Sequence, residues 1–102
     1  MRIVLTNIAP KDAGVLARRL VRDRLAACVN LLPVRSIYRW EGAVQEEEEA
    51  TLLIKVSEAG LTRLVTALEE LHPYDVPEIV VLEVDVERSL DAYVDWVREE
   101  TA

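Results

Sequence analysis

The chain has 102 residues, which is enough for one domain with a single hydrophobic core, and we take 1–102 as that domain. Its 19 acidic and 12 basic residues give a formal charge of −7 without clustered Lys and Arg, which argues against nucleic acid as a partner. One cysteine excludes an internal disulfide, and no apolar run is long enough to cross a membrane. We therefore expect a cytoplasmic protein.

The first expected elements are a short strand and an amphipathic helix. Residues 2–8 are rich in β-branched and apolar residues and predict the strand. Pro10 suits the first turn of a helix, and Asp12 complements the positive end of that helix. Apolar residues then recur at helical spacing as far as Val21, with most basic residues on the other face.

The segment 25–40 predicts a long, bent strand. Residues 25–32 are almost all apolar, so this half should be covered on both faces. Pro33 marks an edge position, a bulge or a bend. Beyond it, the even-numbered residues 34–40, with Tyr38 and Trp40, share one face, and Arg35, Ile37 and Arg39 share the other. The strand is therefore expected to begin in the core and to leave it as an arm.

A turn at Glu41-Gly42 is expected to send the chain back, which makes 25–56 a β-hairpin. Residues 46–49 are four consecutive glutamates, so the returning strand carries charge on both faces. Burying either face would carry a heavy desolvation cost, and all four glutamates are expected to project from the core. A two-residue turn would place Arg35 opposite Glu48, a cross-strand pair worth about 0.2 to 1 kcal/mol.

The C-terminal half predicts a helix, a strand and a further helix. Ser57 is expected to cap a helix whose apolar residues run from 61 to 71, and Pro73 ends that helix. A last strand is expected over residues 78–86. Ser89 is then expected to open a terminal helix whose apolar stripe begins at Leu90.

The order β-α-β-β-α-β, with an added C-terminal helix, predicts a ferredoxin-like α+β fold with a long protruding β-hairpin. Two helices would cover one face of the sheet and leave the other face, which carries apolar residues, open. An isolated domain of this size should not expose so large an apolar patch. We therefore expect a homo-oligomer in which the hairpins pair with neighbouring sheets.

Three segments resemble the signature segments of the CutA divalent-cation-tolerance family. They are residues 24–30 (RLAACVN), 36–42 (SIYRWEG) and 72–79 (HPYDVPEI), and the likeness extends over nearly the whole chain. The resemblance implies a ferredoxin-like homotrimer related in architecture to the PII signalling proteins. It also implies a link to tolerance of copper and other divalent metals, with no established catalytic activity.

Cys28 and His72 are the candidate metal ligands. The Cys28 thiolate would be a soft ligand, and the neutral His72 imidazole could bind copper or zinc. Each has another explanation, since Cys28 lies in an apolar strand and His72 closes a helix, where it could contact the last carbonyls. One chain lacks the four ligands of a structural zinc site, so metal binding would need carboxylates or other subunits.

Lys55 and Glu78 are charges that we expect to be partly buried. Lys55 ends an apolar strand and Glu78 follows a proline-constrained loop, so a salt bridge is one interpretation. The other interpretation places both in a polar inter-subunit cleft, with Asn30, His72 and Tyr74, that could hold a small ligand or ion.

The tip of the hairpin carries Tyr38, Arg39 and Trp40, which we expect at the trimer interface because aromatic residues are enriched at interfaces. For the two aromatic residues and Tyr74, a ligand-stacking platform is the less favoured alternative.

Three functional classes compete. A non-enzymatic trimer for tolerance of or response to divalent metal, copper above all, leads because of the resemblance. A PII-like small-molecule-binding regulator is the alternative, although the chain has only 3 glycines and no Gly-rich phosphate loop. An enzyme comes third, because the Arg and Asn arrangement of the acylphosphatases is missing and fold alone is not function.

Overall fold

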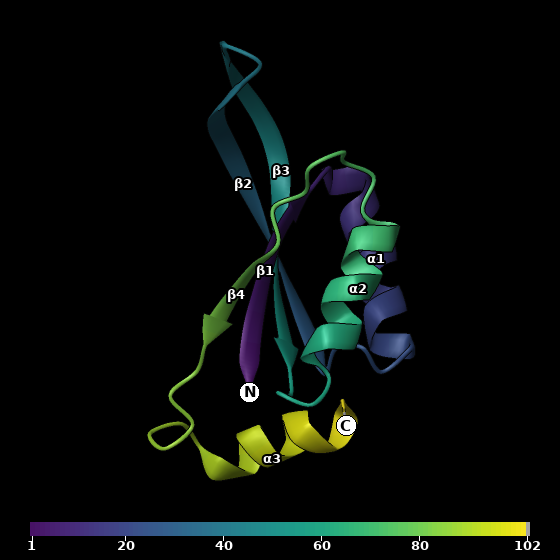
Figure 1. The fold of residues 1–102 in the computed structure, drawn as a ribbon, viewed down its shortest axis with the longest axis vertical. Helices are drawn as coiled ribbons and strands as arrows, with labels where there is room; N and C mark the ends of the chain where they lie inside the picture. Colours follow the sequence, from purple (N-terminus) through teal and green to yellow (C-terminus); the bar gives the residue numbers. More distant parts are fainter. Residues whose placement is uncertain (102) are drawn as a thin grey trace.

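The computed structural model describes residues 1–101, which form a four-stranded antiparallel sheet and three helices (Figure 1). In chain order the elements are β1 (Arg2–Ile8), α1 (Pro10–Arg22), β2 (Cys28–Trp40), β3 (Ala43–Val56), α2 (Leu61–Leu71), β4 (Val80–Glu83) and α3 (Asp91–Glu100). The strands lie in the order β2-β3-β1-β4, with β1 and β3 in the centre. This is the ferredoxin-like arrangement, and the predicted α+β fold is confirmed.

Helices α1 and α2 pack on one face of the sheet, and the core lies between them and the strands (Figure 1). Side chains of a strand alternate between its faces, so every second residue of β1 and β3 points toward the helices. The central strands, the two helices and the loop after α1 contribute these buried residues: Val4, Ile8, Ala13, Leu16, Ala17, Leu20, Ala26, Ala50, Leu52, Ile54, Val56, Leu64 and Leu68.

The opposite face of the sheet, which we call the open face, is apolar and is not covered by the two helices (Figure 1). Leu5 lies between Leu53 of β3 and Val80 of β4, and these side chains share this face. Leu82 lies beside Ile3 in the same way. Leu82 and Val80 are each 42% exposed, so a substantial apolar surface faces solvent in the single chain.

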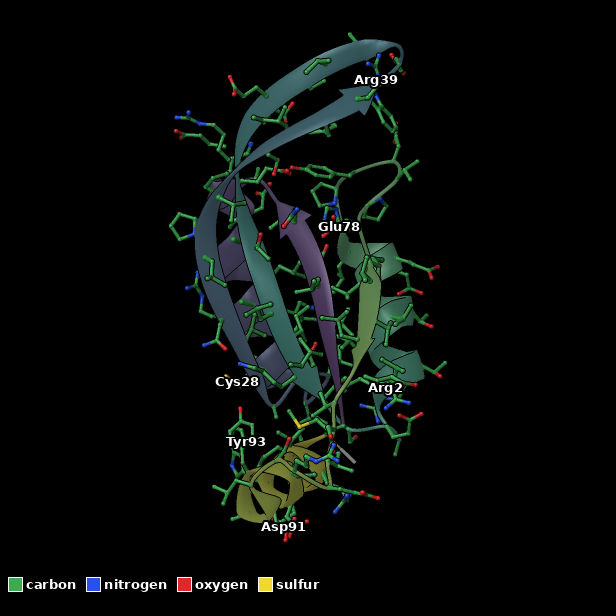
Figure 2. The ribbon with its side chains drawn as sticks, turned by 90° about the vertical axis from the view of Figure 1, so that its left-hand side faces the viewer. Arg2, Cys28, Arg39, Glu78, Asp91 and Tyr93 are labelled. Atoms are coloured by element: carbon green, nitrogen blue, oxygen red, sulfur yellow. The ribbon has the colours of Figure 1, made fainter. Side chains whose placement is uncertain are left out.

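The hairpin of β2 and β3 projects beyond the rest of the sheet. The last pair between β1 and β3 is Ile8 with Ala50, so residues 34–49 pair only with each other, and we call them the arm. Figure 2 shows the arm curving away from the sheet with Arg39 near its tip. The turn at Glu41-Gly42 has φ values of 49° and 80°, which is the left-handed geometry of a type I′ hairpin turn. The predicted arm is therefore confirmed. The first half of the strand was expected to be covered on both faces, but β2 is an edge strand, and Leu31 and Leu32 are 44% and 42% exposed in the single chain.

The predicted register of the arm is also confirmed, because Arg35 lies directly opposite Glu48. Among residues 1–101, however, no ion pair joins these two side chains. One face of the arm carries Arg35, Arg39 and Glu48, and the other carries Tyr38 and Trp40. The two strands of the arm are therefore joined by their backbone pairing and not by that charge pair.

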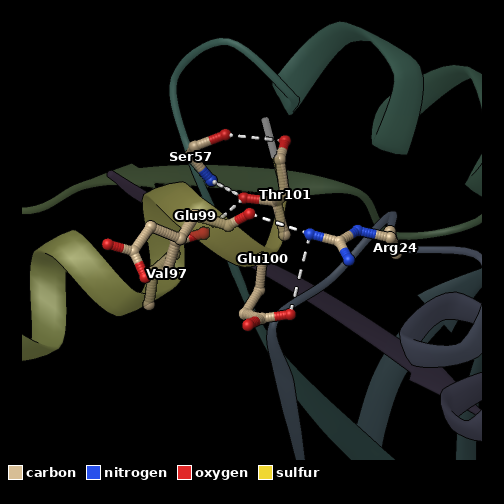
Figure 3. A network of polar contacts seen from close by, with 6 residues as sticks. All are labelled: Arg24, Ser57, Val97, Glu99, Glu100 and Thr101. Carbon is tan, nitrogen blue, oxygen red and sulfur yellow. Dashed lines mark hydrogen bonds and ion pairs between the residues drawn. The ribbon is translucent and has the colours of Figure 1, made fainter.

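The C-terminal end of α3 is fixed to the loop that precedes α2 (Figure 3). The backbone N–H of Ser57 donates to Thr101 Oγ1 at 2.9 Å, and Ser57 Oγ donates to the Thr101 carbonyl at 3.0 Å. Ser57 was predicted to cap α2, but the N-cap position belongs to Gly60, whose N–H donates to Ser57 Oγ. Arg24 adds a hydrogen bond of 2.9 Å to the carbonyl of Glu99. Ser57 therefore supports the loop and α3 rather than the first turn of α2.

Two boundaries near the C-terminus were predicted wrongly. The strand expected over 78–86 is only Val80–Glu83. It ends at Glu83 because Glu83 pairs with Arg2, the first residue of its partner strand β1. The terminal helix begins at Asp91 rather than at Ser89, whose hydroxyl donates to the Asp85 carbonyl within the preceding turn. Leu90 is 73% exposed and does not belong to the buried stripe.

We expect Thr6→Val to stabilise the fold. Thr6 Oγ1 is the one buried side-chain polar atom of residues 1–101 that lacks a hydrogen-bond partner. Replacing this hydroxyl by a methyl group of similar shape should raise the free energy of unfolding by about 1 kcal/mol, measured by chemical denaturation. Thr51→Val is the matched control, because Thr51 Oγ1 donates to Asn7 Oδ1 at 2.6 Å and its loss should not stabilise. A Thr6→Val variant less stable than the parent would contradict this account.

Candidate functional site

A chain of hydrogen bonds joins β1, β3 and the loop after α2 at the base of the arm. The Tyr74 hydroxyl donates to Glu49 Oε2 at 2.7 Å, and the Tyr74 backbone N–H donates to His72 Nδ1 at 3.2 Å. His72 Nε2 lies 2.9 Å from the Asn7 carbonyl oxygen, and the Asn7 side chain accepts from Thr51. These bonds hold the 72–78 loop against the sheet at the point where the arm leaves it.

His72 is 7% exposed, and both of its ring nitrogens have partners. Since Nδ1 accepts from the Tyr74 N–H, the proton of the neutral ring resides on Nε2 and is donated to Asn7. The ring also meets the Tyr74 ring edge-on at 4.7 Å. His72 was expected to contact the last helix carbonyls, but its ring bonds the carbonyl of β1 instead. In the single chain it is a structural link between α2, the loop and β1.

Glu49 is buried, contrary to the expectation that the whole 46–49 run projects into solvent. Only 6% of it is exposed, and Tyr74 covers it with a hydrogen bond. Burial, followed by the hydrogen bond to Glu49 and the charge of Glu49, raises the pKa of Tyr74 well above its usual value. At neutral pH the Tyr74 hydroxyl therefore keeps its proton and donates it to Glu49 Oε2.

A cavity of about 730 Å³ opens between the arm and the 72–78 loop. One wall is the arm face that carries Tyr38 and Trp40, and the other is the loop with Tyr74 and Glu78. Figure 2 shows Glu78 on this loop, below the arm. Acidic, amide, aromatic and apolar side chains line it: Asn7, Ser36, Ile37, Tyr38, Trp40, Gln45, Glu47, Glu49, Tyr74, Asp75, Val76 and Glu78.

A second polar group lies at the other end of the sheet, next to α3. Lys55 Nζ contacts Asn30 Oδ1 and lies 4.0 Å from Cys28 Sγ, on the open face. Tyr93 of α3 is a neighbour of Cys28, and burial first, then the nearby thiol, raise the pKa of Tyr93. Figure 2 shows Cys28 close to Tyr93 and far from Glu78.

The predicted site residues are therefore divided within one chain. Tyr74 and Glu78 share the cavity at the base of the arm, whereas Asn30, Lys55 and Cys28 lie near α3. The residues predicted for one cleft form two groups that a single chain does not bring together.

The two candidate metal ligands, Cys28 and His72, are separated in the same way. Among residues 1–101, no three side chains of His, Cys, Asp or Glu are grouped so that they could hold a metal ion. Arg39 lies on the face of the arm opposite Tyr38 and Trp40, so the three predicted interface residues point in two directions.

Sequence reasoning missed Asn7, Gln45, Glu47 and Glu49 as cavity residues. A signal was present for the last three. Once Arg35 is paired with Glu48, the alternation of strand side chains puts Gln45, Glu47 and Glu49 on the same face of the arm as Tyr38. The contribution of Asn7 carried no signal, because it depends on how the 72–78 loop folds back on β1.

No helix within residues 1–101 has the length and apolar character needed to span a bilayer. The sheet order and the projecting arm define the chain as a ferredoxin-like α+β protein. The sequence matches the CutA1 divalent ion tolerance protein family over residues 2–100, and the chain belongs to this family.

Individual relatives agree with this assignment. The divalent-cation tolerance protein CutA of Thermus thermophilus is 43% identical over 100 residues, which cover 97% of this chain and 95% of that protein. The structure of the PII-like protein CutA from Nostoc sp. PCC 7120 in apo form has a TM-score of 0.98 and 51% identity, covering 100% of this chain and 98% of the other. CutA1 from Pyrococcus horikoshii has a TM-score of 0.92 and 36% identity, covering 100% and 99%.

Proposed function

We propose that the protein is a non-enzymatic homotrimer that acts in tolerance of divalent metal, with copper as the metal it binds. The observation that carries this proposal is the family match over residues 2–100, together with the divalent-cation tolerance named for the Thermus relative. The acidic charge of −7 favours cations over anions as partners. The single cysteine suits a cytoplasmic location, which stays a prediction.

The apolar open face supports the trimer. Val80 and Leu82 are half-exposed there, and Leu32 of the edge strand β2 is exposed to the same degree. The arm adds exposed aromatic side chains and two strands that pair only with each other beyond Ile8. A neighbouring arm laid across the open face would cover both surfaces at once, and a closed ring of three copies would leave none of them uncovered.

Copper binding would use groups from more than one subunit. Cys28 pairs with Lys55 near α3, whereas His72 bonds Asn7 at the base of the arm, and both ring nitrogens of His72 are engaged in hydrogen bonds. A shared site would therefore need Cys28 of one copy to lie close to carboxylates of another copy, or to its His72 after that ring has given up a hydrogen bond. Cys28 is only partly buried, which leaves its sulfur within reach of a neighbour.

A copper titration of Cys28→Ser and His72→Ala tests this proposal. Loss of a ligand should weaken binding by about tenfold or more, read by calorimetry with the trimer intact. Glu46→Gln is the control for diffuse attraction, because Glu46 lies on the exposed arm. If copper binding is unchanged in both ligand variants and is abolished by salt, the proposal is wrong, and copper is held only by diffuse attraction to surface carboxylates.

A PII-like small-molecule-binding regulator is the second candidate. It is favoured by the cavity at the base of the arm, which has the volume of a ligand site and a wall of aromatic side chains. Calorimetric titration with nucleotides tests whether the cavity binds a nucleotide or some other small molecule. We expect no nucleotide binding, because the cavity lining, among residues 1–101, holds no Lys or Arg to meet phosphate.

A further inference from the structure

A groove of about 530 Å³ lies between α1 and the edge strand β2, outside the arm. Its wall on the strand side is formed by Val29 and Leu31. These residues lie opposite Ile54 and Leu52 of β3, which are fully buried beneath the helices. Side chains of directly opposite residues point to the same face of a sheet, so the groove lies on the helix side. A neighbouring arm laid across the open face would therefore leave this groove uncovered.

Two arginines of α1, Arg18 and Arg22, form the charged part of the groove. They are four residues apart, so they are neighbours on successive turns of the helix. Among residues 1–101 neither makes an ion pair, whereas Arg19 of the same helix pairs with Asp23 at 3.4 Å. Arg22 lies in the last turn, where its charge complements the helix dipole, but that role leaves its N–H donors unused. Within the described chain, the groove therefore holds two guanidinium groups without a carboxylate partner.

Gly14 gives the Arg18 guanidinium its place beside the groove. A Cβ at position 14 would lie 3.2 Å from Arg18 Nη1 and 3.4 Å from Nη2, so the guanidinium lies against the bare backbone one turn earlier. Glycine is less favourable than alanine in the interior of a helix, and no other element packs closely enough here to require it, since Arg18 supplies the three atoms nearest to that Cβ. The groove explains the position, because a glycine leaves room for Arg18 and for a ligand beside it.

The rest of the lining is small and apolar, and it consists of Gly14, Ala17, Val21, Val29 and Leu31. Val21 and Leu31 are 43% and 44% exposed, so a ligand with an apolar body would remove apolar surface from water. An arginine fork binds the two oxygens of a carboxylate through parallel N–H groups. A free phosphate has more oxygens to satisfy, and the lining offers no side-chain donors besides the two arginines. The groove is therefore better suited to a carboxylate that carries an apolar body.

We propose that the groove between α1 and β2 binds a small organic anion, a carboxylate attached to a short aliphatic tail. The carboxylate lies between the guanidinium groups of Arg18 and Arg22, and the tail lies along Val21, Val29 and Leu31. The protein has a formal charge of −7, so a bound anion is held by these local contacts and not by the overall field. This site goes beyond the proposed function and is independent of copper and of the cavity at the base of the arm.

Octanoate is the probe, and calorimetric titration of the intact oligomer measures its binding. We expect Arg18→Gln and Arg22→Gln each to weaken binding about tenfold or more, the scale of a lost hydrogen bond to a charged group. Arg19→Gln is the matched control, because it removes the same charge from the same helix but outside the groove. Since Arg19 is already paired with Asp23, we expect a change of less than about twofold for this variant.

Two further measurements test the apolar part of the site. Acetate has the same carboxylate without the long tail, so it should bind about tenfold or more weakly than octanoate, because burial of each methylene group is favourable. Gly14→Leu places a side chain in the groove and beside Arg18 without removing a charge, and leucine is a better helix former than glycine. We expect this variant to lose octanoate binding while its unfolding midpoint stays at or above that of the parent.

Absence of octanoate binding to the parent would overturn the proposal. Equal weakening by Arg19→Gln would also overturn it, because that result would mean general attraction to the charge of α1. Equal affinity for acetate would do the same, since the apolar wall would then play no part. If octanoate fails to bind and Arg18→Gln or Arg22→Gln, but not Arg19→Gln, weakens the oligomer, an acidic side chain of another copy occupies the groove and the proposal is wrong. Copper titration of the same samples measures the metal proposal separately.

Discussion

Trp40→Ala is expected to convert the trimer into smaller species at micromolar concentration. Trp40 lies at the tip of the arm, opposite Ala43, and 44% of it is exposed in the single chain. An exposed tryptophan on a protruding hairpin is a large apolar surface that a neighbouring copy can cover. In the proposed trimer it is an anchor that is buried only on assembly.

The size of the effect follows from burial and symmetry. Truncating a buried aromatic residue costs about 3 to 5 kcal/mol through lost transfer free energy and the cavity that remains. A closed trimer repeats this loss at every equivalent interface. We therefore expect light scattering to show dissociation on dilution, and the melting temperature to fall together with it.

Val44→Ala is the control on the same arm. Val44 is 65% exposed, pairs with Arg39 and shares the face of Arg39 rather than that of Trp40. It removes a smaller side chain, so the trimer should persist with a shift of the melting temperature of a few degrees at most. An intact trimer and a nearly unchanged melting temperature for Trp40→Ala would mean that the arm tip is free, as a mobile sensor would be.

The sheet and its arm could be predicted from the sequence because both depend on local and periodic signals. The two-residue turn at Glu41-Gly42 fixes the register of the whole hairpin, and this alone places Arg35 opposite Glu48. Gly42 supplies the positive φ that such a turn needs, while Glu41 adopts it with a side chain. Once the hairpin is set, every pair along 34–49 follows.

The candidate site could be predicted only in part, because its geometry depends on contacts between distant segments. Glu49 was expected in solvent, since a run of four glutamates gives no sign that one of them is covered. Its burial comes from Tyr74, which is 25 residues away along the chain and reaches it through a hydrogen bond. Asn30 and Lys55 are likewise separated from Glu78 within one chain, because they lie near opposite ends of the sheet. Their polar character alone gave no sign of this separation.

Gly60→Ala is expected to detach the end of α3 and to lower the free energy of unfolding strongly. The backbone of Gly60 has a φ of −89°, which any residue can adopt, so the effect is one of space. A Cβ at this position would lie 2.5 Å from the Thr101 carbonyl oxygen and 3.2 Å from Ser57 Oγ. Those two atoms form the hydrogen bond that closes α3 against the loop before α2 (Figure 3).

None of the neighbours of that Cβ can move cheaply. Thr101 O is backbone, Ser57 Oγ is hydrogen-bonded to it, and Val56 Cγ2, 3.3 Å away, belongs to a fully buried side chain. Overpacking of this kind costs about 1 to 3 kcal/mol, and the detached end would also expose the buried Val94 and Val97. We expect faster hydrogen exchange across residues 91–101 together with a lower unfolding midpoint in denaturant. Gly14→Ala is the control, because its Cβ would meet only the flexible Arg18 guanidinium at 3.2 Å, and alanine within a helix should stabilise by about 0.5 to 1 kcal/mol. A Gly60→Ala protein as stable as the parent, with α3 equally protected, would show that the Ser57–Thr101 contact does not hold the helix in place.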